Sequence, residues 1–390
     1  MRPAFLDTSR LRSASLPFAA NGVLYGTWAA RIPEVQARAG LSEGELGLAL
    51  LGAALGLVVS ASAAGPLVAR LGAHRVTLAA LAAFAVVVVS PGLAAGFASL
   101  ALALVLVGLA SGLLDVAMNA HATGVEAASG RTILGACHGL FSLGMMAGAG
   151  LGALAARFDI TLALHFGASG LVFAGAALVQ GWRVEVPHLA ASSEGPLFAV
   201  PVGSVAGLGA LAFCGLIVEG AMADWSAVFL RERIGASESV AALGVAAFSG
   251  CMAAGRFAAD GLTARFGDVR LVRWGALLAI AGLVACVAAP RAGLAVAGFG
   301  LVGLGLAAVV PALFRAASRA PGLAPGSGIA AVTSTGYLGF LAGPPAIGFV
   351  AEGAGLGTAF GLLGGLAALV ALGAGAAFRR ARPAAAPSRG

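Results

Sequence analysis

Long unbroken apolar runs restrict this chain to few folds. Residues 48–68, for example, read LALLGAALGLVVSASAAGPLV and contain no charged side chain. A helix needs about 20 mostly apolar residues to cross the hydrocarbon core of a bilayer, and similar runs recur along all 390 residues. A transmembrane β-barrel would instead alternate apolar and polar residues. The runs therefore predict spanning helices.

The composition excludes two other classes of protein. The chain is 60% apolar and 10% charged, whereas a soluble domain has about 25% charged residues and a disordered chain is polar and highly charged. The net charge is +7, but the arginines do not cluster in a soluble module, so we expect no nucleic-acid partner. We predict an all-α polytopic membrane protein embedded in the lipid bilayer.

Charged residues, Pro, Gly and Ser divide the chain into twelve predicted spans. Their ranges are 14–33, 45–68, 76–94, 98–122, 133–155, 161–181, 201–224, 239–262, 272–290, 292–314, 327–350 and 357–378. We expect an N-terminal six-helix bundle at 1–181, a central cytoplasmic linker at 182–200, a C-terminal six-helix bundle at 201–378 and a cytoplasmic tail at 379–390.

The basic residues, all of them arginine, give the predicted orientation. With both termini in the cytoplasm, sixteen of the 23 fall in inside segments, six fall in outside segments and Arg256 lies within a span. Cytoplasmic loops of membrane proteins carry this excess of basic residues. We therefore expect a multi-pass protein of the bacterial cytoplasmic (inner) membrane.

Five short patterns recur at one offset of 195 residues, which indicates two parallel repeats. The pairs are Gly40-Leu-Ser-Glu43 with Gly235-Ala-Ser-Glu238, Arg70-Leu-Gly72 with Arg265-Phe-Gly267, Arg75 with Arg270, Leu106-Val-Gly-Leu109 with Leu301-Val-Gly-Leu304, and Gly144-x-x-x-Gly148 with Gly339-x-x-x-Gly343. Transporters built from two such halves bind their solute near the midplane, between the halves.

The loop after the second span resembles the cytoplasmic loop motif of the major facilitator superfamily, G-x-x-x-D-R-x-G-R-R. It reads Gly65-Pro-Leu-Val-Ala-Arg70-Leu-Gly72-Ala-His-Arg75, with Ala69 at the position of the Asp. The second half repeats it between Asp260 and Arg270. The resemblance implies the major-facilitator fold, with 12 transmembrane helices in two six-helix bundles.

A narrower resemblance is to fucose-permease-like transporters. It is carried by Asp115-Val-Ala-Met-Asn119, by His138-Gly-Leu-Phe-Ser142 and by Glu219-Gly-Ala-Met-Ala-Asp224-Trp225. It implies proton-coupled uptake of a sugar-like solute, with Asp115 and Glu219 as proton-coupling residues. An acid inside a span usually faces a water-filled cavity or other protein groups. The alternatives are a carboxylate bonded to a neighbouring helix or to Arg131 for Asp115, and helix-packing hydrogen bonds for Glu219.

Further candidate residues lie near these acids. Asn21, Tyr25 and Trp28 recur at helical spacing in the first span, and Asn119 lies one turn after Asp115. With His138 they are the predicted substrate-binding residues, although the first three also suit interface anchoring and His138 also suits packing. Near the outer surface, we expect Asp224 to pair with Arg231 and Arg31 to pair with Glu34.

The superfamily resemblance also implies a cytoplasmic gate, in which ion pairs close the inner side of the transporter. Its predicted residues are Arg70, Arg75, Arg256, Asp260 and Arg265. The alternative is that these charges only set the topology.

These observations predict a secondary active transporter that takes up a small hydrophilic solute by alternating access. Proton-antiport efflux of drugs or metabolites is the alternative, because Gly144-x-x-x-Gly148-x-x-x-Gly152 resembles a motif of drug exporters. The sequence contains no Walker motif and no H-E-x-x-H motif, so we expect no catalytic residue, metal or cofactor, and no enzyme. The expected partners are the solute, protons and lipid, and we expect a monomer.

Overall fold

The computed structural model describes residues 4–182, 203–288 and 291–382. Residues 183–200 of the predicted linker and residues 383–390 of the predicted tail lie outside this part of the chain. The first half of the described chain is helical. Its elements are α1 (Ala4–Ala30), α2 (Ile32–Ala39), α3 (Glu43–Leu71), α4 (Ala73–Val87), η1 (Ser90–Leu93), α5 (Phe97–Ser129), α6 (Leu134–Arg157), α7 (Leu162–Ser169), η2 (Gly170–Ala174) and α8 (Gly175–Trp182).

The second half is helical as well. Its elements are η3 (Gly203–Val205), α9 (Ala206–Val228), η4 (Phe229–Arg233), α10 (Glu238–Phe266), α11 (Asp268–Ala288), α12 (Ala292–Leu306), α13 (Val309–Ala317), α14 (Pro325–Ala354) and α15 (Leu356–Arg380). The turns η2 and η4 are π-helical and continue the helices that precede them.

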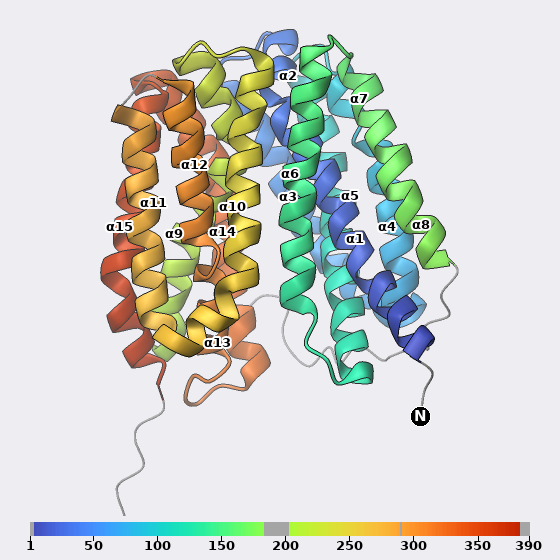
Figure 1. Ribbon diagram of the computed structural model, residues 1–390, viewed down its shortest axis with the longest axis vertical. Coiled ribbons are helices and arrows are strands. Elements are labelled where there is room, and N and C mark those ends of the chain that lie inside the picture. The colour runs from blue at the N-terminus through green and yellow to red at the C-terminus, as the bar shows by residue number, and fades with distance from the viewer. Residues whose placement is uncertain (1–3, 183–202, 289–290, 383–390) are drawn as a thin grey trace, which may run out of the picture.

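Ten helical segments of the described chain are long and apolar enough to cross a membrane. They do not include α1, of 27 residues, or α14, of 30 residues, which run beside them over a similar height (Figure 1). The predicted all-helical membrane fold is confirmed, and the arrangement is consistent with twelve spans.

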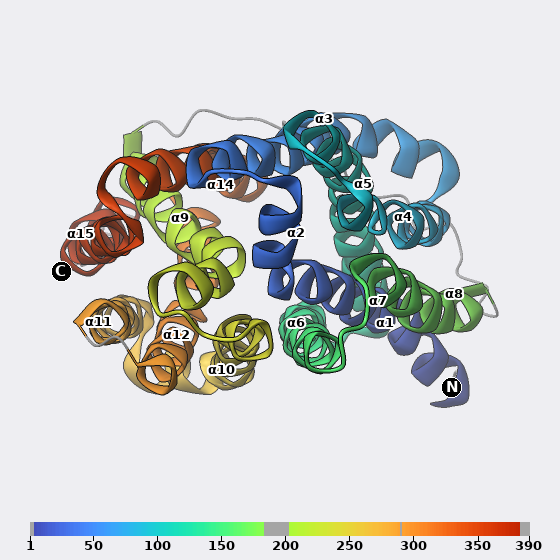
Figure 2. The same ribbon diagram turned by 90° about the horizontal axis from the view of Figure 1, so that it is seen from above.

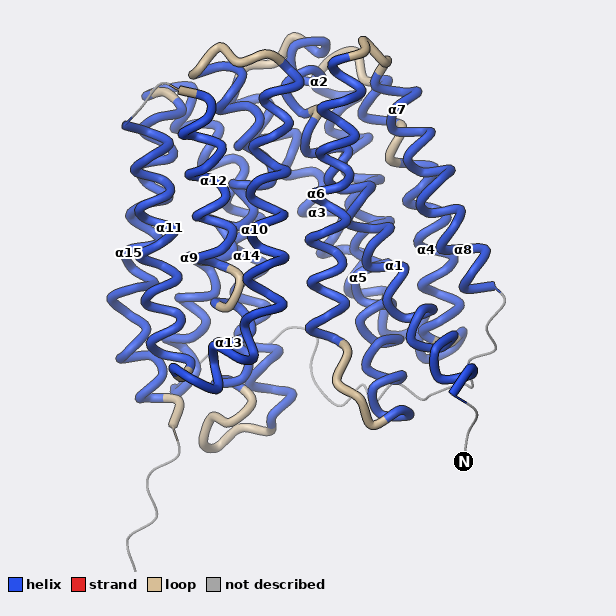
Figure 3. Tube along the Cα trace, viewed as in Figure 1, coloured by secondary structure: helices blue, strands red, loops and turns tan. Residues whose placement is uncertain are grey.

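Seen from above, the helices form two groups (Figure 2). The elements α1 to α8 form one group and α9 to α15 the other, and α2 lies between them. We call the end of the molecule that carries α2 the α2 end. The start of α1 and the finish of α15 both lie at the opposite end (Figures 1 and 3), which we call the terminal end. The groups meet through α3 against α14 and through α6 against α10.

The repeat seen in the sequence has a counterpart in the backbone. Gly40 and Gly235, one repeat apart, have positive φ angles of 67° and 71°, and Gly72 and Gly267 have φ angles of 85° and 78°. Side chains other than glycine are strained in this region. The matching glycines therefore end the equivalent helices of the two halves in the same way.

The glycine repeats allow the helices to approach closely. A Cβ atom on Gly144 would lie 2.3 Å from the carbonyl oxygen of Ala19 on α1, and one on Gly339 would lie 2.7 Å from that of Phe213 on α9. Small residues are what permit such contacts between membrane helices. The α1–α6 pair in one half thus corresponds to the α9–α14 pair in the other.

The predicted end of the seventh span was wrong. The seventh span was expected to end at residue 224, but the helix continues through η4 to Arg233. The tenth span, expected at 292–314, corresponds to one apolar segment from Ala292 to Ala317, within which the helix is interrupted at residues 307 and 308 between α12 and α13. Pro311 explains the break, because proline has no N–H group to bond the carbonyl of residue 307.

Candidate functional site

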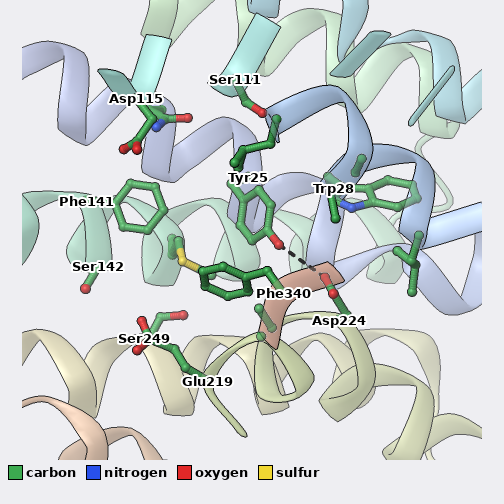
Figure 4. Close-up of a pocket in the computed structure, with 18 of the residues that line it drawn as sticks. Tyr25, Trp28, Ser111, Asp115, Phe141, Ser142, Glu219, Asp224, Ser249 and Phe340 are labelled. Carbon is green, nitrogen blue, oxygen red and sulfur yellow. Dashed lines mark hydrogen bonds between the residues drawn. The ribbon is translucent and has the colours of Figure 1, made fainter. Parts of the chain in front are cut away.

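A cavity of about 250 Å³ lies between the two groups of helices. Side chains from both groups meet in it, as Figure 4 shows. Its polar lining residues are Asn21, Ser111, Asp115, Ser142, Glu219, Asp224, Ser249 and Arg256. Its aromatic lining residues are Tyr25, Trp28, Phe141, Phe248, Tyr337 and Phe340.

Asp115 lies on α5 in the wall of the cavity. Asn119, one helical turn later, donates to its Oδ1 atom at 3.1 Å. The hydroxyl of Tyr337, on α14 of the other group, hydrogen-bonds the same carboxyl. Asp115 therefore connects the two halves through neutral partners.

Asp224 lies on α9, buried to 8% exposure, and the Tyr25 hydroxyl donates to its Oδ1 atom at 3.2 Å (Figure 4). The predicted pair of Asp224 with Arg231 was wrong, since the Arg231 guanidinium instead donates to the carbonyl of Ala236. The reason is the longer seventh helix, which places Asp224 two turns inside the helix end rather than at the surface.

Arg256 on α10 lines the cavity. Its guanidinium lies 2.9 Å from Glu219 Oε1 on α9 and donates to the Ser142 hydroxyl on α6 at 2.7 Å. The gate prediction expected Arg256 at the cytoplasmic surface beside Asp260. Arg256 instead lines the cavity, because its guanidinium bonds Glu219 and Ser142, whereas Asp260 is exposed.

The structure brings most of the predicted binding residues together. Asn21, Tyr25 and Trp28 line the cavity, and Asn119 lies behind Asp115 as its hydrogen-bond partner. His138 is outside the lining, where its ring meets Phe18 edge-on at 5.3 Å and its backbone carbonyl accepts from Arg256. Its side chain thus packs inside the first half.

Comparison with curated proteins finds relatives over nearly the whole chain. An uncharacterised MFS-type transporter of Yersinia pestis is 36% identical over 379 residues, which cover 94% of this chain and 95% of the relative. An uncharacterised transporter of Sinorhizobium fredii is 34% identical over 364 residues, covering 93% and 96%. MFS abbreviates major facilitator superfamily.

The chain belongs to the major facilitator superfamily.

A third relative, the membrane protein MosC of Rhizobium meliloti, is 30% identical over 355 residues, covering 90% of this chain and 85% of MosC. A search against models of protein families finds no match. Among solved structures, the nucleoside transporter NupG matches with a TM-score of 0.71 at 11% identity, over 96% of this chain and 100% of NupG. A bacterial homologue of the lysosomal transporter Spinster, inward-facing and unoccupied, matches with a TM-score of 0.72 at 17% identity, over 99% and 100%. These likenesses concern the fold.

The other predicted gate residues of this major-facilitator chain lie at the terminal end. Arg70 lies in the last turn of α3, Arg75 in the first turn of α4 and Arg265 in the last turn of α10, and all three side chains are exposed. The Arg265 guanidinium lies 5.2 Å from the centre of the Phe266 ring. Nearby, Arg315 bonds Asp268 at 2.7 Å.

At the α2 end, Arg31 and Glu34 form the predicted ion pair. Arg31 also donates to the carbonyl of Ile160 at 3.1 Å. Burial raises the pKa of Glu34, the Arg31 guanidinium opposes that shift, and the facing carboxyl of Glu238 on α10 adds to it. The two halves thus meet here through a pair of acids.

Sequence reasoning missed Tyr337 and Phe340 as lining residues. A signal for Tyr337 was available, because the chain has only 2 tyrosines. The two tyrosines, Tyr25 and Tyr337, both line the cavity, and each bonds a carboxyl of the opposite half. In the described residues, no group of three His, Cys, Asp or Glu side chains is placed to hold a metal ion.

Proposed function

We propose that this chain is a proton-coupled secondary transporter that takes up a small hydrophilic solute by alternating access. The observation that carries the proposal is the cavity between the halves, in which Asp115 lies beside polar and aromatic side chains and accepts hydrogen bonds from both halves. A transporter needs a solute site that both halves line, so that their relative motion changes the side from which it is reached.

A proton on Asp115 directly changes the hydrogen bonds that this side chain forms. An ionised Asp115 only accepts hydrogen bonds, whereas a protonated one can also donate. Gain or loss of the proton therefore changes how strongly α5 and α14 hold each other through Tyr337. A ligand shifts a conformational equilibrium only by binding the two states differently, and here the proton acts as that ligand.

The proposal also includes the orientation of the protein in the membrane. The terminal end carries the exposed arginines Arg70, Arg75 and Arg265, and cytoplasmic surfaces hold such an excess of basic residues. The α2 end then faces outward. A cysteine replacing the exposed Ser237 should react with an impermeant reagent applied to intact cells, whereas one replacing the exposed Ala128 should not.

The test of function uses Asp115→Asn in reconstituted vesicles. Asparagine keeps the size and hydrogen bonding of aspartate but does not ionise. The solute is taken as the best transported member of a panel of glucose, glucosamine, gluconate and uridine. We expect uphill accumulation to vanish while exchange between equal concentrations persists, because exchange requires no release of the proton.

Two results would count against this role of Asp115. Equal loss of accumulation and exchange would mean that Asp115 only packs, and normal accumulation would transfer the proton-coupling role to Glu219. The control is Glu232→Gln, which neutralises an exposed acid in the second half and should leave both activities unchanged. Uptake by the unmodified protein that needs sodium and ignores a protonophore would reject proton coupling altogether.

Proton-antiport efflux is the second candidate, and the aromatic lining of the cavity favours it. Six aromatic rings, from Tyr25, Trp28, Phe141, Phe248, Tyr337 and Phe340, line the cavity, and flat apolar faces suit drug-like solutes. The direction of proton movement separates the candidates. In uptake, adding solute outside the vesicles carries protons inward with it, whereas in antiport the protons move outward.

A further inference from the structure

The charges that line the cavity do not balance. Among the described lining residues, three carboxyls, Asp115, Glu219 and Asp224, face one guanidinium, that of Arg256. Arg256 is already committed, because its Nη2 atom lies 2.9 Å from Glu219 and both side chains are mostly buried, at 16% and 19% exposure. The pair neutralises itself and leaves two acids without a cation.

Both remaining acids have only neutral hydrogen-bond partners in the described residues. Asp224 accepts from the Tyr25 hydroxyl, and Asp115 accepts from the Asn119 amide and the Tyr337 hydroxyl. A neutral donor stabilises a buried carboxylate less than a cation does. The cavity is therefore a place where a positive charge would be bound favourably.

The surroundings of Asp224 suit an ammonium group in particular. Tyr25 and Trp28 lie on the same side of the cavity as Asp224, and the Tyr25 hydroxyl points at the carboxyl (Figure 4). Tyrosine and tryptophan faces attract cations within about 6 Å. A carboxylate beside two aromatic side chains supplies both the charge and the faces that recognise an amine.

We propose that the transported solute carries a positively charged amino group, which Asp224 binds among Tyr25 and Trp28, while Asp115 remains available for the proton. This inference rests on the proposed function, since it names the class of solute for the same cavity. The rival is an anionic solute held by Arg256 after its release from Glu219. The two differ in the sign of the electrostatic potential in the cavity.

The potential can be measured without knowing the solute. Ser111 lies in the lining one helical turn before Asp115 (Figure 4), and its side chain is half-buried. A Ser111→Cys variant in detergent is treated with the cationic trimethylammonium-ethyl and the anionic sulfonatoethyl methanethiosulfonate reagents, each calibrated on a free thiol. The protein without this substitution gives the background of the native cysteines, of which three are buried and Cys251 is half-buried.

We expect the cationic reagent to react at least about tenfold faster, because unbalanced carboxylates in a partly buried cavity attract a cation and repel an anion. Adding Asp224→Asn should reduce this preference several-fold, Asp224→Glu should restore it, and the exposed Glu232→Gln should not alter it. A preference for the anionic reagent overturns the proposal in favour of Arg256. An undiminished cation preference in Asp224→Asn, with Asp224→Glu unchanged, overturns the assignment to Asp224.

A second measurement tests binding directly. Ethanolamine and ethylene glycol differ mainly in one amino group, and each is added as a protectant of Ser111→Cys. Stronger protection by ethanolamine supports the proposal, while equal protection or none contradicts it. Both measurements use detergent and no gradient, so failure of proton-driven accumulation would leave their results intact, and a neutral cavity would leave accumulation intact.

Discussion

Arg256 and Glu219 lie at the point where the two halves share their charges. The guanidinium belongs to α10 and the carboxylate to α9, but the same guanidinium also donates to Ser142 on α6 of the first half. A mostly buried ion pair is costly to break by removing one partner, because the other charge is left unpaired. This ion pair therefore holds α9 and α10 together beside α6 in the wall of the cavity.

A double-mutant cycle should reveal how strongly Glu219 and Arg256 depend on each other as an ion pair. We expect Glu219→Gln and Arg256→Gln each to lower the stability of the protein by about 1–3 kcal/mol, and the double variant to lower it by less than the sum. The measurement is the free energy of unfolding in detergent, and additive effects would show that the two side chains do not act as a pair. The exposed pair of positions Glu232 and Arg265 supplies the control, for which additivity is expected.

The sequence indicated which ionisable residues enter the cavity more reliably than it indicated their partners. Asp115, Glu219 and three of the predicted binding residues line the cavity, because polar residues inside apolar spans usually face the bundle interior or a water-filled cavity. Their partners depend on helix rotation and on contacts between halves. Tyr337, for instance, is 222 positions after Asp115, and no local pattern relates the two.

At the scale of single elements, the close contact of α1 with α6 shows how the small residues are used. A Cβ atom on Gly148 would lie 2.1 Å from the carbonyl oxygen of Val23, whereas one on Gly150, two residues later in the same helix, would meet nothing within 4 Å. The two glycines thus form a matched pair, in which only one is required by packing.

Gly148→Ala should destabilise the protein by about 1–3 kcal/mol, because an added methyl group overpacks a helix contact. Gly150→Ala should leave stability unchanged or raise it by up to about 1 kcal/mol, since alanine favours helix. Thermal unfolding of the two purified variants checks this. Equal midpoints for both would show that α1 and α6 are not in close contact.

Glu34 on α2 gives a pH dependence whose sign follows from its surroundings. Burial and the carboxyl of Glu238 raise the pKa of Glu34, against the opposing effect of Arg31. A carboxyl with a raised pKa binds its proton more tightly in the folded protein than in the unfolded chain, so its contribution is most favourable below the ordinary value of 4.5. That contribution is lost as the pH rises through the raised pKa.

Glu34→Gln should therefore flatten the pH profile of stability just above pH 4.5, where the raised pKa of Glu34 has its effect. Thermal midpoints of the two proteins across mildly acidic buffers provide the measurement. The unmodified protein should lose stability relative to Glu34→Gln as the pH rises, and a gain would contradict the assigned sign. Glu232→Gln should follow the unmodified protein at every pH.

The positions of the elements were largely predictable, because each long apolar run had to become a spanning helix. The ends of the helices were less predictable where a helix continues past its apolar run, as α9 does through η4 to Arg233. The charged residues of η4 gave no reason in the sequence to extend the helix. Because of that error, Asp224 was predicted near the outer surface, whereas it lines the cavity.

At the scale of the whole molecule, the two halves meet at the α2 end in the described state. The helix α2 contacts α9, and Gly47 on α3 packs against Gly348 on α14. The proposed mechanism requires a second state in which this end opens while the terminal end closes. Protons should shift the balance, because Glu34 and Glu238 would separate on opening.

The distances between the halves, measured by electron-spin labels at both ends, test this central claim most directly. One pair replaces the exposed Ala37 and Ser237 at the α2 end, and the other replaces the exposed Ala69 and Ala264, which are 195 residues apart, at the terminal end. The four native cysteines are replaced by alanine, and samples in lipid are compared at acid and alkaline pH.

We predict reciprocal changes in the two distances. Acid pH should shorten the distance at the α2 end and lengthen the one at the terminal end, alkaline pH should do the reverse, and Glu34→Gln should retain more of the acid distances at alkaline pH. Distances at both ends that do not respond to pH, or that lengthen and shorten together, would contradict proton-coupled alternating access.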